Sequence, residues 1–398
     1  MKKSIRIPKH LDSITPFQAV EVFQAASALE AKGRSIIHLE FGEPDLPTPA
    51  PIKEAAIKAM LDGRTKYTHS LGIPPLREEI CRYHGAKYGT ELHPDQVVVS
   101  MGTSVLTQML MLMLLEPGDE VILPNPTYAC YASFVLMAGG KPVYVPISEK
   151  EGFQLDPGAV KKKITPRTRA IMVCSPANPT GVVMRSEVMQ ALAGLGIPII
   201  SDEIYHGLTY SGPEHSMLEF TDNAFVLNGF SKYFAMTGWR LGYMIFPKQA
   251  QATVMKMHQN IMISATDFIQ HAGIAALSES TPECEGYKAE YDRRRIYMVE
   301  RLNEIGLPLK YEPVGAFYCF ADASRYGRNS LKLAMDILKE AGVAVTPGID
   351  FGPGGEGYLR FSYANSLDNI AEGMDRLGKW LKNKAGKKAS KKTGNKKK

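Results

Sequence analysis

The 398-residue sequence predicts an α/β fold, in which helices cover both faces of a mostly parallel seven-stranded sheet and a smaller α+β unit lies beside it. From about residue 95, short apolar runs rich in β-branched residues alternate with helical patterns. Runs such as 197–200 are continuously apolar, which is typical of strands buried on both faces. Beyond about residue 285 the pattern changes to a charged amphipathic helix followed by strands, which indicates a second unit.

The elements follow from these patterns in chain order. Seven apolar runs are expected to be the strands of the large sheet: Val97–Ser100, Val121–Leu123, Val143–Val145, Ala170–Cys174, Pro198–Ser201, Phe225–Asn228 and Leu241–Ile245. Helical patterns between them cover Ser104–Leu115, Ala129–Ala138 and Ser186–Leu195. The second unit is expected to hold helices at Tyr287–Ile305 and Leu331–Ala341 and strands at Gly315–Phe320 and Tyr358–Tyr363.

These patterns divide the chain into four parts. Residues 1–46 are expected to pack with the small unit, residues 47–285 to form the large domain, and residues 286–381 to form the small domain. The Lys-rich tail, residues 382–398, contains nine lysines and no acid, so it is expected to be disordered. Since the net charge is +6, the rest of the chain carries 6 − 9 = −3, and its charge does not indicate nucleic-acid binding. A solvated terminus is the favoured interpretation of the tail, and an arm for an anionic partner is the alternative.

Cysteine usage and hydropathy indicate a cytoplasmic protein. The five cysteines are scattered, odd in number and without a C-x-x-C pair, which argues for a reducing compartment and against a disulfide framework or a zinc ribbon. Polar residues interrupt the N-terminal segment, so no signal peptide is expected. The longest apolar stretch, Met109–Leu115, is too short to cross a bilayer.

Chemically informative residues follow the expected strands. Ligands bind at the carboxyl edge of an open parallel sheet, so residues just after each strand are the candidates. Gly102, Thr103 and Ser104 open a helix whose free N–H groups suit a phosphate, although such a turn is common in proteins that bind none. Tyr128 follows the next strand, where it either stacks on a flat ring or caps the core.

Two further strands end in polar residues. Asn178 is presented between two prolines in a rigid loop. Asp202 ends an apolar strand, where a carboxylate is costly to bury without a cationic partner, although a lone Asp more often caps a following helix. Tyr205, three residues later, is expected on the same side of one helical turn.

The last strand-end group centres on Lys232. It lies among aromatic and apolar residues, which should lower its pKa and make the neutral amine a nucleophile for a carbonyl. Arg240, eight residues later, offers a fork of donors that suits phosphate. A single lysine is usually a surface residue, but convergence with Asp202, Asn178 and an arginine at one sheet edge weakens that interpretation.

These motifs resemble the class I/II aminotransferases, which belong to the fold-type I pyridoxal phosphate enzymes. The resemblance rests on the run from Ser231-Lys232 to Tyr243, on Asn178-Pro179-Thr180-Gly181 and on Asp202-Glu203-Ile204-Tyr205. It extends from Phe41-Gly42-Glu43-Pro44-Asp45 to Arg360-Phe361-Ser362-Tyr363-Ala364, and the Lys-rich tail lies outside it.

The resemblance implies a transaminase that moves an amino group between an L-amino acid and a 2-oxo acid by a ping-pong reaction. Lys232 would hold pyridoxal 5′-phosphate as a Schiff base and carry the proton, and Asp202 would keep the pyridine nitrogen protonated. Asn178 and Tyr205 would bond the ring 3-oxygen, and Tyr128 would stack on the ring. The phosphate would be held by Gly102, Thr103, Ser104, Ser231 and Arg240.

The resemblance also implies substrate contacts and a partner. Arg360 would clamp the substrate α-carboxylate, assisted by the Gly42 backbone and Asn178. Tyr67 matches a position that reaches the phosphate of the neighbouring subunit, which implies a homodimer with shared sites, although interface packing would also explain it. Similar aspartate aminotransferases usually carry Lys at the position of Ser104 and Trp at the position of Tyr128. This departure favours a neutral or aromatic amino donor.

Two alternatives are open. A pyridoxal phosphate-dependent C–S lyase, acting by β-elimination, would also need Lys232, Asp202 and Arg360. A non-catalytic aminotransferase-like module would use the Lys-rich tail as a nucleic-acid arm. No membrane partner and no metal is expected.

Overall fold

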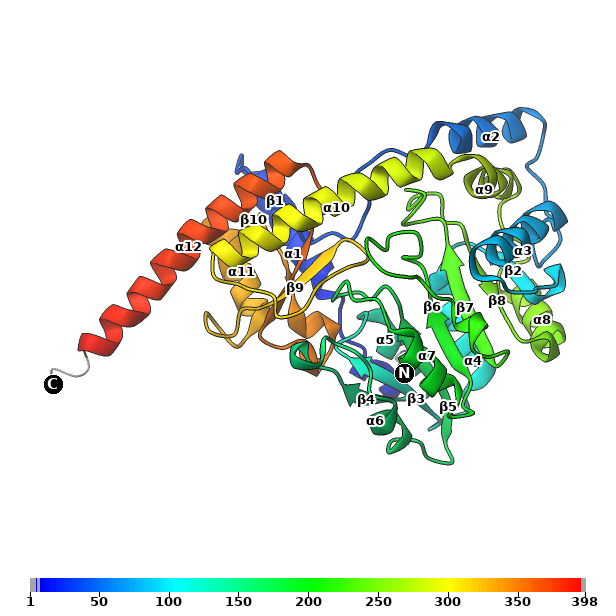
Figure 1. Ribbon diagram of the computed structural model, residues 1–398, viewed down its shortest axis with the longest axis horizontal. Helices are drawn as coiled ribbons and strands as arrows, with labels where there is room; N and C mark the ends of the chain where they lie inside the picture. The colour runs from blue at the N-terminus through cyan, green and yellow to red at the C-terminus, as the bar shows by residue number, and fades with distance from the viewer. Residues whose placement is uncertain (1–4, 6–7, 395–398) are drawn as a thin grey trace.

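Buried β-branched runs form the central sheet of the computed structural model, which describes residues 5 and 8–394 (Figure 1). The sheet has the order β2-β8-β7-β6-β5-β3-β4, and only β8 runs antiparallel to its neighbours among these seven strands. The strands are β2 Val97–Ser100, β3 Glu120–Asn125, β4 Lys141–Pro146, β5 Thr168–Cys174, β6 Ile199–Asp202, β7 Ala224–Gly229 and β8 Gly242–Ile245. All seven expected strands are present, so the predicted fold class is confirmed.

Helices cover both faces of this sheet. Helices α4 Thr103–Leu114 and α5 Cys130–Met137 cover one face, and α6 Pro157–Lys161 and α7 Ser186–Ala193 cover the other (Figure 1). Further helices flank the sheet: α2 Ala50–Leu61, α3 Pro74–Tyr88, α8 Gln251–Ile261 and α9 Asp267–Glu279. Short 3-10 helices lie at η1 Lys9–Ser13, η2 Pro94–Gln96, η3 Glu149–Glu151, η4 Met217–Glu219, η5 Lys248–Ala250, η6 Gly348–Phe351 and η7 Pro353–Gly355.

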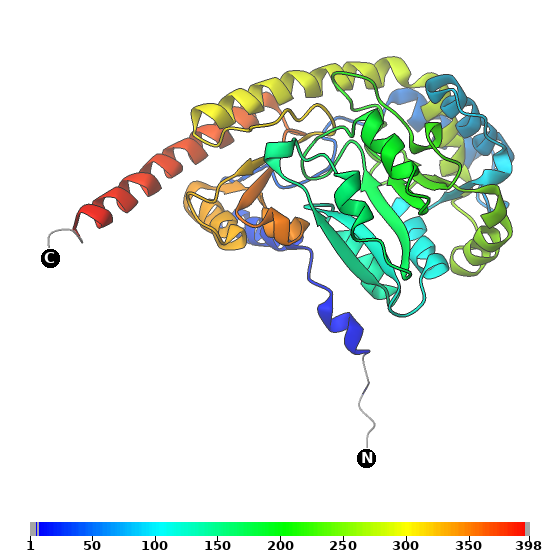
Figure 2. The same cartoon turned by 60° about the horizontal axis from the view of Figure 1, so that its bottom comes forward.

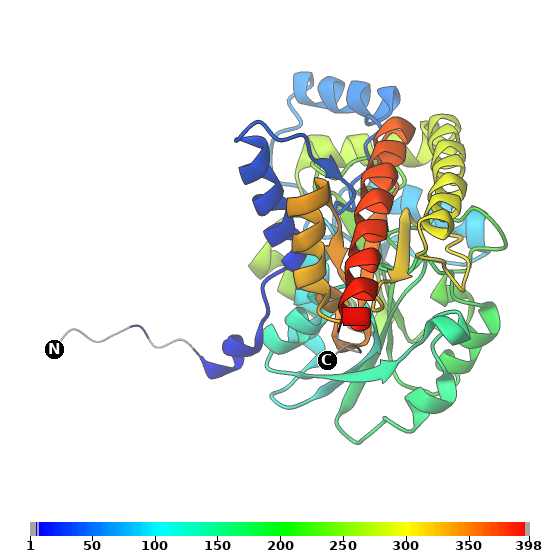
Figure 3. The ribbon, with the colours of Figure 1, turned by 90° about the vertical axis from the view of Figure 1, so that its left-hand side faces the viewer.

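The small unit combines both ends of the chain. Its antiparallel sheet has the order β11-β12-β9, formed by β9 Tyr318–Asp322, β11 Thr346–Pro347 and β12 Tyr358–Ser362. Strand β1 Ile37–His38 pairs in parallel with β10 Val343–Ala344. Helices α1 Gln18–Glu30, α11 Ser330–Ala341 and α12 Leu367–Gly394 lie side by side (Figure 3). Helix α1 and strand β1 therefore pack with the C-terminal part, and η1, which contacts α5, projects from the small unit (Figure 2).

One helix joins the two units. Helix α10 Thr281–Glu304 runs from α9 in the large unit toward α12 in the small unit (Figure 1). It begins six residues before the expected Tyr287, because Pro282 suits the first turn of a helix. The helix is continuous across residues 285 and 286, where we expected the domain boundary, and the boundaries stay predictions.

The Lys-rich tail differs from its expectation. Helix α12 continues through it to Gly394 and leads away from the body (Figure 1), whereas we expected disorder over residues 382–398. Lysine and alanine favour helix, and extending an existing helix requires no new nucleation. Residues 395–398 lie outside the described part of the chain.

None of the helices in the described residues is long and apolar enough to cross a membrane. All five cysteines carry free thiols. The described residues also contain no group of acidic, histidine and cysteine side chains that could hold a metal ion.

Candidate active site

A cavity of about 340 Å³ opens at the carboxyl edge of the large sheet, where the small unit meets it. Strands β2, β3, β5, β6 and β7 all end at this edge, and β8 begins there. Their loops bring together most of the residues that the sequence singled out. The following candidates line the cavity: Gly42, Thr103, Ser104, Tyr128, Asn178, Asp202, Tyr205, Ser231, Lys232, Arg240 and Arg360.

Lys232 follows β7 and points into this cavity. Its Nζ donates a 2.7 Å hydrogen bond to the carbonyl oxygen of Gly42 and lies 6.0 Å from the ring centres of Tyr205 and Phe317. Burial lowers the pKa of Lys232 to about 8, although nearby Glu43 opposes the change. A substantial fraction of this amine is therefore neutral near pH 8, and the neutral form is the nucleophile.

Asp202 ends β6 and is buried below the same cavity. Its Oδ2 accepts a 2.7 Å hydrogen bond from the hydroxyl of Tyr131, and its Oδ1 accepts one of 3.1 Å from the backbone N–H of Ile204. Burial raises the pKa of Asp202, against the hydrogen bonds from Tyr131 and Ile204 and the charge of Lys232. No cationic side chain of the described residues forms an ion pair with it, so a protonated ligand nitrogen fits beside this carboxylate.

Asn178 and Tyr205 lie next to each other in the cavity. The Asn178 Nδ2 donates to the Tyr205 hydroxyl over 3.5 Å, and that hydroxyl lies 2.8 Å from the hydroxyl of Tyr318. Tyr205 belongs to a non-helical turn, so the expected helical turn is wrong, and no helix follows Asp202 for it to cap. The turn still places Asp202 and Tyr205 on the same cavity wall.

The start of α4 and Arg240 form a candidate anion site. Gly102, with φ +85°, precedes α4, and a Cβ there would lie 2.8 Å from the Arg240 Nη2. Only glycine therefore lets the guanidinium approach the first turn of the helix. Thr103, Ser104 and Ser231 add hydroxyl groups to the cavity wall at this end. Gly102 is not in the lining, but it shapes the site.

Arg360 lies at the opposite end of the cavity on β12. Its Nη1 donates to the Asn178 Oδ1 at 3.0 Å, and its Nη2 donates to the carbonyl oxygen of Glu40 and to Thr346. The guanidinium carbon lies 4.4 Å from the ring centre of Tyr318. Its Nε is buried and has no hydrogen-bond partner among the described residues, which favours an anionic ligand at this place.

Apolar side chains form the mouth of the cavity near Arg360. Phe17, Val20 and Phe41 line it, and Val20 and Phe41 are each 39% exposed. Phe17 meets Tyr128 edge to face at 6.3 Å. The cationic side chains that line the cavity, within the described residues, are Lys232, Arg240 and Arg360.

Tyr67 lies outside the cavity of this chain. It is 81% exposed in the segment between α2 and α3. The structure of one chain does not bring it to the other candidates.

Several contributing residues were not among the predictions. Tyr131 lies one helical turn after Tyr128, a spacing that could have identified it. Tyr318 comes from β9 and meets Tyr205 across 113 positions of sequence, for which the sequence carries no local signal. The apolar residues near α1 were also not predicted to line the site, because their sequence pattern is the same as that of ordinary core residues.

Comparisons with known proteins identify relatives that match over nearly the whole chain. The family described as "Aminotransferase class I and II" matches residues 34–377. A (5-formylfuran-3-yl)methyl phosphate transaminase of Methanocaldococcus jannaschii is 38% identical over 94% of this chain and 99% of its own. An aspartate aminotransferase of Pyrococcus horikoshii is 40% identical over 91% and 93%. The solved aspartate aminotransferase from Thermus thermophilus with maleate is similar with a TM-score of 0.90, at 36% identity over 94% of this chain and 100% of that one.

Proposed function

This chain belongs to the aminotransferase class I and II family and is an aminotransferase, and from that premise we propose that Lys232 carries its cofactor and that its amino donors are neutral or aromatic. Membership in the family implies dependence on pyridoxal phosphate and substrates that are amino acids and 2-oxo acids. The observation that supports the assignment best is the convergence of Lys232, Asp202 and Arg360 on one cavity.

The residues present fit this cofactor. Pyridoxal phosphate supplies an aldehyde that captures amines and a protonated ring that accepts the electron pair freed at the substrate Cα. Lys232 is the amine that holds it, and the same Nζ moves the proton from the substrate Cα. The buried carboxylate of Asp202 holds the proton on the pyridine nitrogen, and its hydrogen bonds from Tyr131 and Ile204 fix its orientation.

Other residues position the ring and the phosphate. Asn178 and Tyr205, which lie together on the cavity wall, would donate to the ring oxygen, and Tyr128 would cover one face of the ring. The first turn of α4, with Thr103, Ser104 and Gly102, accepts the phosphate together with Ser231 and Arg240. These donors lie at the opposite end of the cavity from Arg360, so phosphate and substrate do not compete for them.

The substrate meets Arg360 and the apolar mouth. The Arg360 guanidinium holds the α-carboxylate, next to Asn178 and the Gly42 backbone. Since Lys232, Arg240 and Arg360 already have roles, no lining cation in the described residues remains for a second carboxylate. Phe17, Val20 and Phe41 instead offer apolar surface for a neutral or aromatic side chain.

A homodimer remains part of the proposal. The high exposure of Tyr67 agrees with a role toward the phosphate of a neighbouring subunit. The cytoplasmic location expected from the cysteine pattern also stays a prediction, and no specific observation favours the lyase or the nucleic-acid arm.

Chemical trapping tests the cofactor assignment. The purified protein should be yellow, and borohydride should fix the cofactor covalently to the peptide that contains Lys232. Trapping on another lysine would contradict the assignment. Pyruvate release from cystathionine without a 2-oxo acid acceptor would instead indicate the lyase.

Binding of unreactive acids tests the substrate class independently of turnover. By calorimetry, the holoenzyme should bind 3-phenylpropionate about 10-fold more tightly than succinate, because only the former buries apolar surface at the mouth. Equal or tighter binding of succinate would show that another cation, for example from a partner subunit, completes the site.

A further inference from the structure

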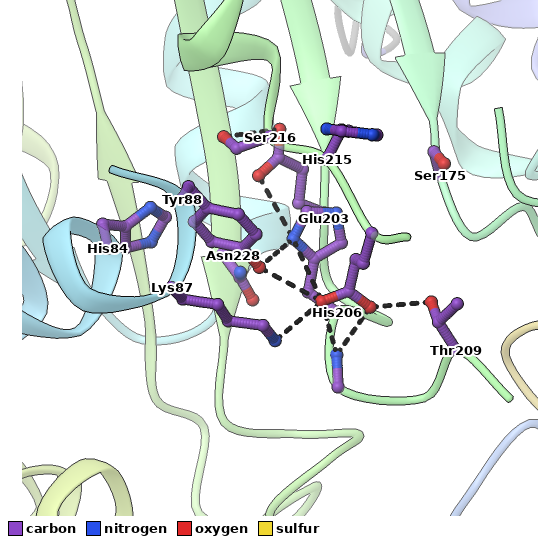
Figure 4. A network of polar contacts seen from close by, with 12 residues as sticks. His84, Lys87, Tyr88, Ser175, Glu203, His206, Thr209, His215, Ser216 and Asn228 are labelled. Carbon is purple, nitrogen blue, oxygen red and sulfur yellow. Dashed lines mark hydrogen bonds and ion pairs between the residues drawn. The ribbon is translucent and has the colours of Figure 1, made fainter. Parts of the chain in front are cut away.

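Behind the cavity wall that carries Asp202 and Tyr205 lies a buried polar group, which we call the rear network (Figure 4). Its members are Lys87, Tyr88, Glu203, His206, Thr209 and Glu214. Asp202 and Tyr205 face the cavity, whereas Glu203 and His206, one residue further along the chain in each case, are buried on the side of the network. One short segment therefore separates the candidate active site from this network.

Glu214 is the centre of the rear network. Its Oε2 accepts hydrogen bonds from the Gly207 backbone N–H at 2.9 Å and from the Thr209 hydroxyl at 2.7 Å. Its Oε1 lies 2.7 Å from the Lys87 Nζ and 3.2 Å from the Tyr88 hydroxyl, which donates to it. Burial alone would raise the pKa of Glu214, but His206, Lys87 and the hydrogen bonds from Lys87 and Thr209 lower it to about 2. Because burial also lowers the pKa of His206 to about 4, Lys87 is the cation beside this carboxylate near neutral pH. The carboxylate is thus ionised throughout the neutral range, and each of these four hydrogen-bonding partners is a donor.

Glu203 holds the loop that carries Glu214 in place. The buried carboxyl group of Glu203, whose pKa burial raises to about 8, accepts hydrogen bonds at Oε1 from the Ser216 hydroxyl at 3.2 Å and from the Met217 backbone N–H at 2.9 Å. It also accepts one of 2.9 Å from Ser201 in β6. The loop that presents Glu214 is therefore anchored to the strand that ends in Asp202.

The segment held by Glu214 is a turn over residues 203–209. At Gly207, φ is +95°, and a Cβ would lie 2.5 Å from the ring of Tyr233, the residue after Lys232. Glu214 is the partner of the Gly207 N–H, so this carboxylate keeps the turn pressed toward Tyr233.

The 203–209 turn positions two residues of the cavity, Asp202 and Tyr205. The Ile204 N–H donates to the Asp202 Oδ1, and Tyr205 extends from the same turn to meet Tyr318. A shift of the turn would move the Tyr205 hydroxyl and remove one of the two hydrogen bonds that orient Asp202. We propose that Glu214 is a positioning residue for the aminotransferase reaction, which holds the 203–209 turn from behind and so sets the position of Tyr205 and the orientation of Asp202. This inference rests on the roles of Tyr205 and Asp202 in the proposed function.

The role of Glu214 requires a side chain in which both terminal atoms accept hydrogen bonds. Glutamine at position 214 keeps the size of the side chain, but its amide N–H₂ then faces either the Gly207 N–H or the Lys87 ammonium, and neither of these groups can accept a hydrogen bond. At least one donor is then left buried without a partner, which moves the turn or costs stability. A residue that merely filled space would tolerate this change.

The test uses the pH titration of the visible absorption band of the holoenzyme. Loss of the hydrogen bond to the ring oxygen should raise the midpoint in Tyr205→Phe by about one pH unit, and Glu214→Gln should raise it by roughly half as much. Because Glu214 acts through Tyr205, the double variant Glu214→Gln/Tyr205→Phe should titrate like Tyr205→Phe alone. The control is Glu149→Gln, which changes a buried carboxylate that accepts the Lys310 N–H away from the cavity lining and should leave the midpoint unchanged.

The remaining outcomes contradict either the positioning role of Glu214 or the proposed function. An unmoved midpoint in Glu214→Gln, or additive shifts in the double variant, overturns the positioning role. If Glu214→Gln does not yield folded holoenzyme, Thr209→Val removes one donor to the same carboxylate, and a smaller shift in the same direction is expected. No shift in Thr209→Val then overturns the inference. A wild-type protein without the band overturns the proposed function itself.

Discussion

The two ends of the cavity are lined by different types of residue. The cofactor half, from the loops of the large sheet, contains Lys232, Asp202 and Tyr205, each with a defined hydrogen-bond partner. The substrate half combines one cation, Arg360, with apolar side chains near α1 that are partly exposed to solvent.

This contrast suggests that one half of the cavity carries out the reaction and that the other half selects the substrate. The cofactor half fixes proton positions through buried donors and acceptors, so changes there should act on kcat. The substrate half offers one charged contact and deformable apolar surface, so changes there should act on KM and on the choice of substrate. Three substitutions test this division, and a fourth tests the burial of a histidine behind the cofactor half.

The largest effect is expected at the centre of the cofactor half. Lys232→Ala removes the nucleophile and the proton carrier together, so kcat should fall by about 10⁴-fold or more while the cofactor still binds non-covalently. Steady-state kinetics and absorption spectra measure both properties. Lys248→Ala, an exposed lysine on η5, is the control. A kcat within about 10-fold of wild type in Lys232→Ala would contradict the role of this amine.

A substantial effect on KM is expected in the substrate half. Arg360→Lys keeps the charge but loses the fork of donors, so KM for the amino donor should rise about 10- to 100-fold with a smaller change in kcat. Initial rates over a range of donor concentrations separate the two constants. Arg376→Lys changes an arginine that binds the Ser35 carbonyl at the surface and should have no effect. A loss confined to kcat would refute the division between the halves.

A change of preference is expected at the cavity mouth. Val20→Arg places a cation on the apolar wall, so kcat/KM for glutamate relative to phenylalanine should rise about 10-fold. Gln24→Arg adds the same charge one turn further along α1, outside the cavity lining, and should leave the ratio unchanged. The same ratio in both variants would mean that the wall near α1 does not meet the substrate side chain.

The smallest effect concerns the buried surroundings of the cofactor half. His84 in α3 contacts the Tyr243 hydroxyl at 3.0 Å, and burial lowers its pKa to about 3. The unfolded chain therefore takes up this proton first, and the free energy of unfolding decreases as pH falls below about 6.5 toward the folded pKa. In His84→Gln this dependence between pH 4 and 6 should be shallower by about 1.4 kcal/mol per pH unit.

Urea unfolding at several pH values measures that slope. His93→Gln is the control, because His93 is exposed at the start of η2. Identical slopes in the wild type and in His84→Gln would mean that water reaches this histidine in the folded protein.

Local patterns were sufficient to predict the sheet and the sheet edge at which the candidate residues meet. The seven strands were recognisable because their apolar runs are short and bounded by polar loops, as around Ile199–Asp202. Convergence at one edge followed because parallel strands end on the same side. Lys232, Asp202 and Arg360 were placed together on this basis and on the family resemblance, and the cavity contains all three.

Contacts between distant segments were not predictable in the same way. Tyr131 meets Asp202 across 71 positions, and Glu214 reaches back to a turn whose shape depends on Gly207. Neither pairing has a periodicity or spacing signature. The helical form of the Lys-rich tail was missed because composition indicates solubility but does not exclude continuation of a preceding helix.

The uninterrupted course of α10 has a practical consequence for anyone who wishes to produce the two units separately. A fragment that stops at residue 285 would cut this helix within its second turn, and would strip away Tyr291, Met298 and Leu302, which are buried along its length. Arg294, which is bonded to Asp45 of the N-terminal segment at 2.8 Å, would be lost with them. Two fragments divided at residue 285 should aggregate when each is expressed alone, because each exposes apolar surface that α10 normally buries. Co-expression of both fragments should yield soluble protein that neither fragment gives alone.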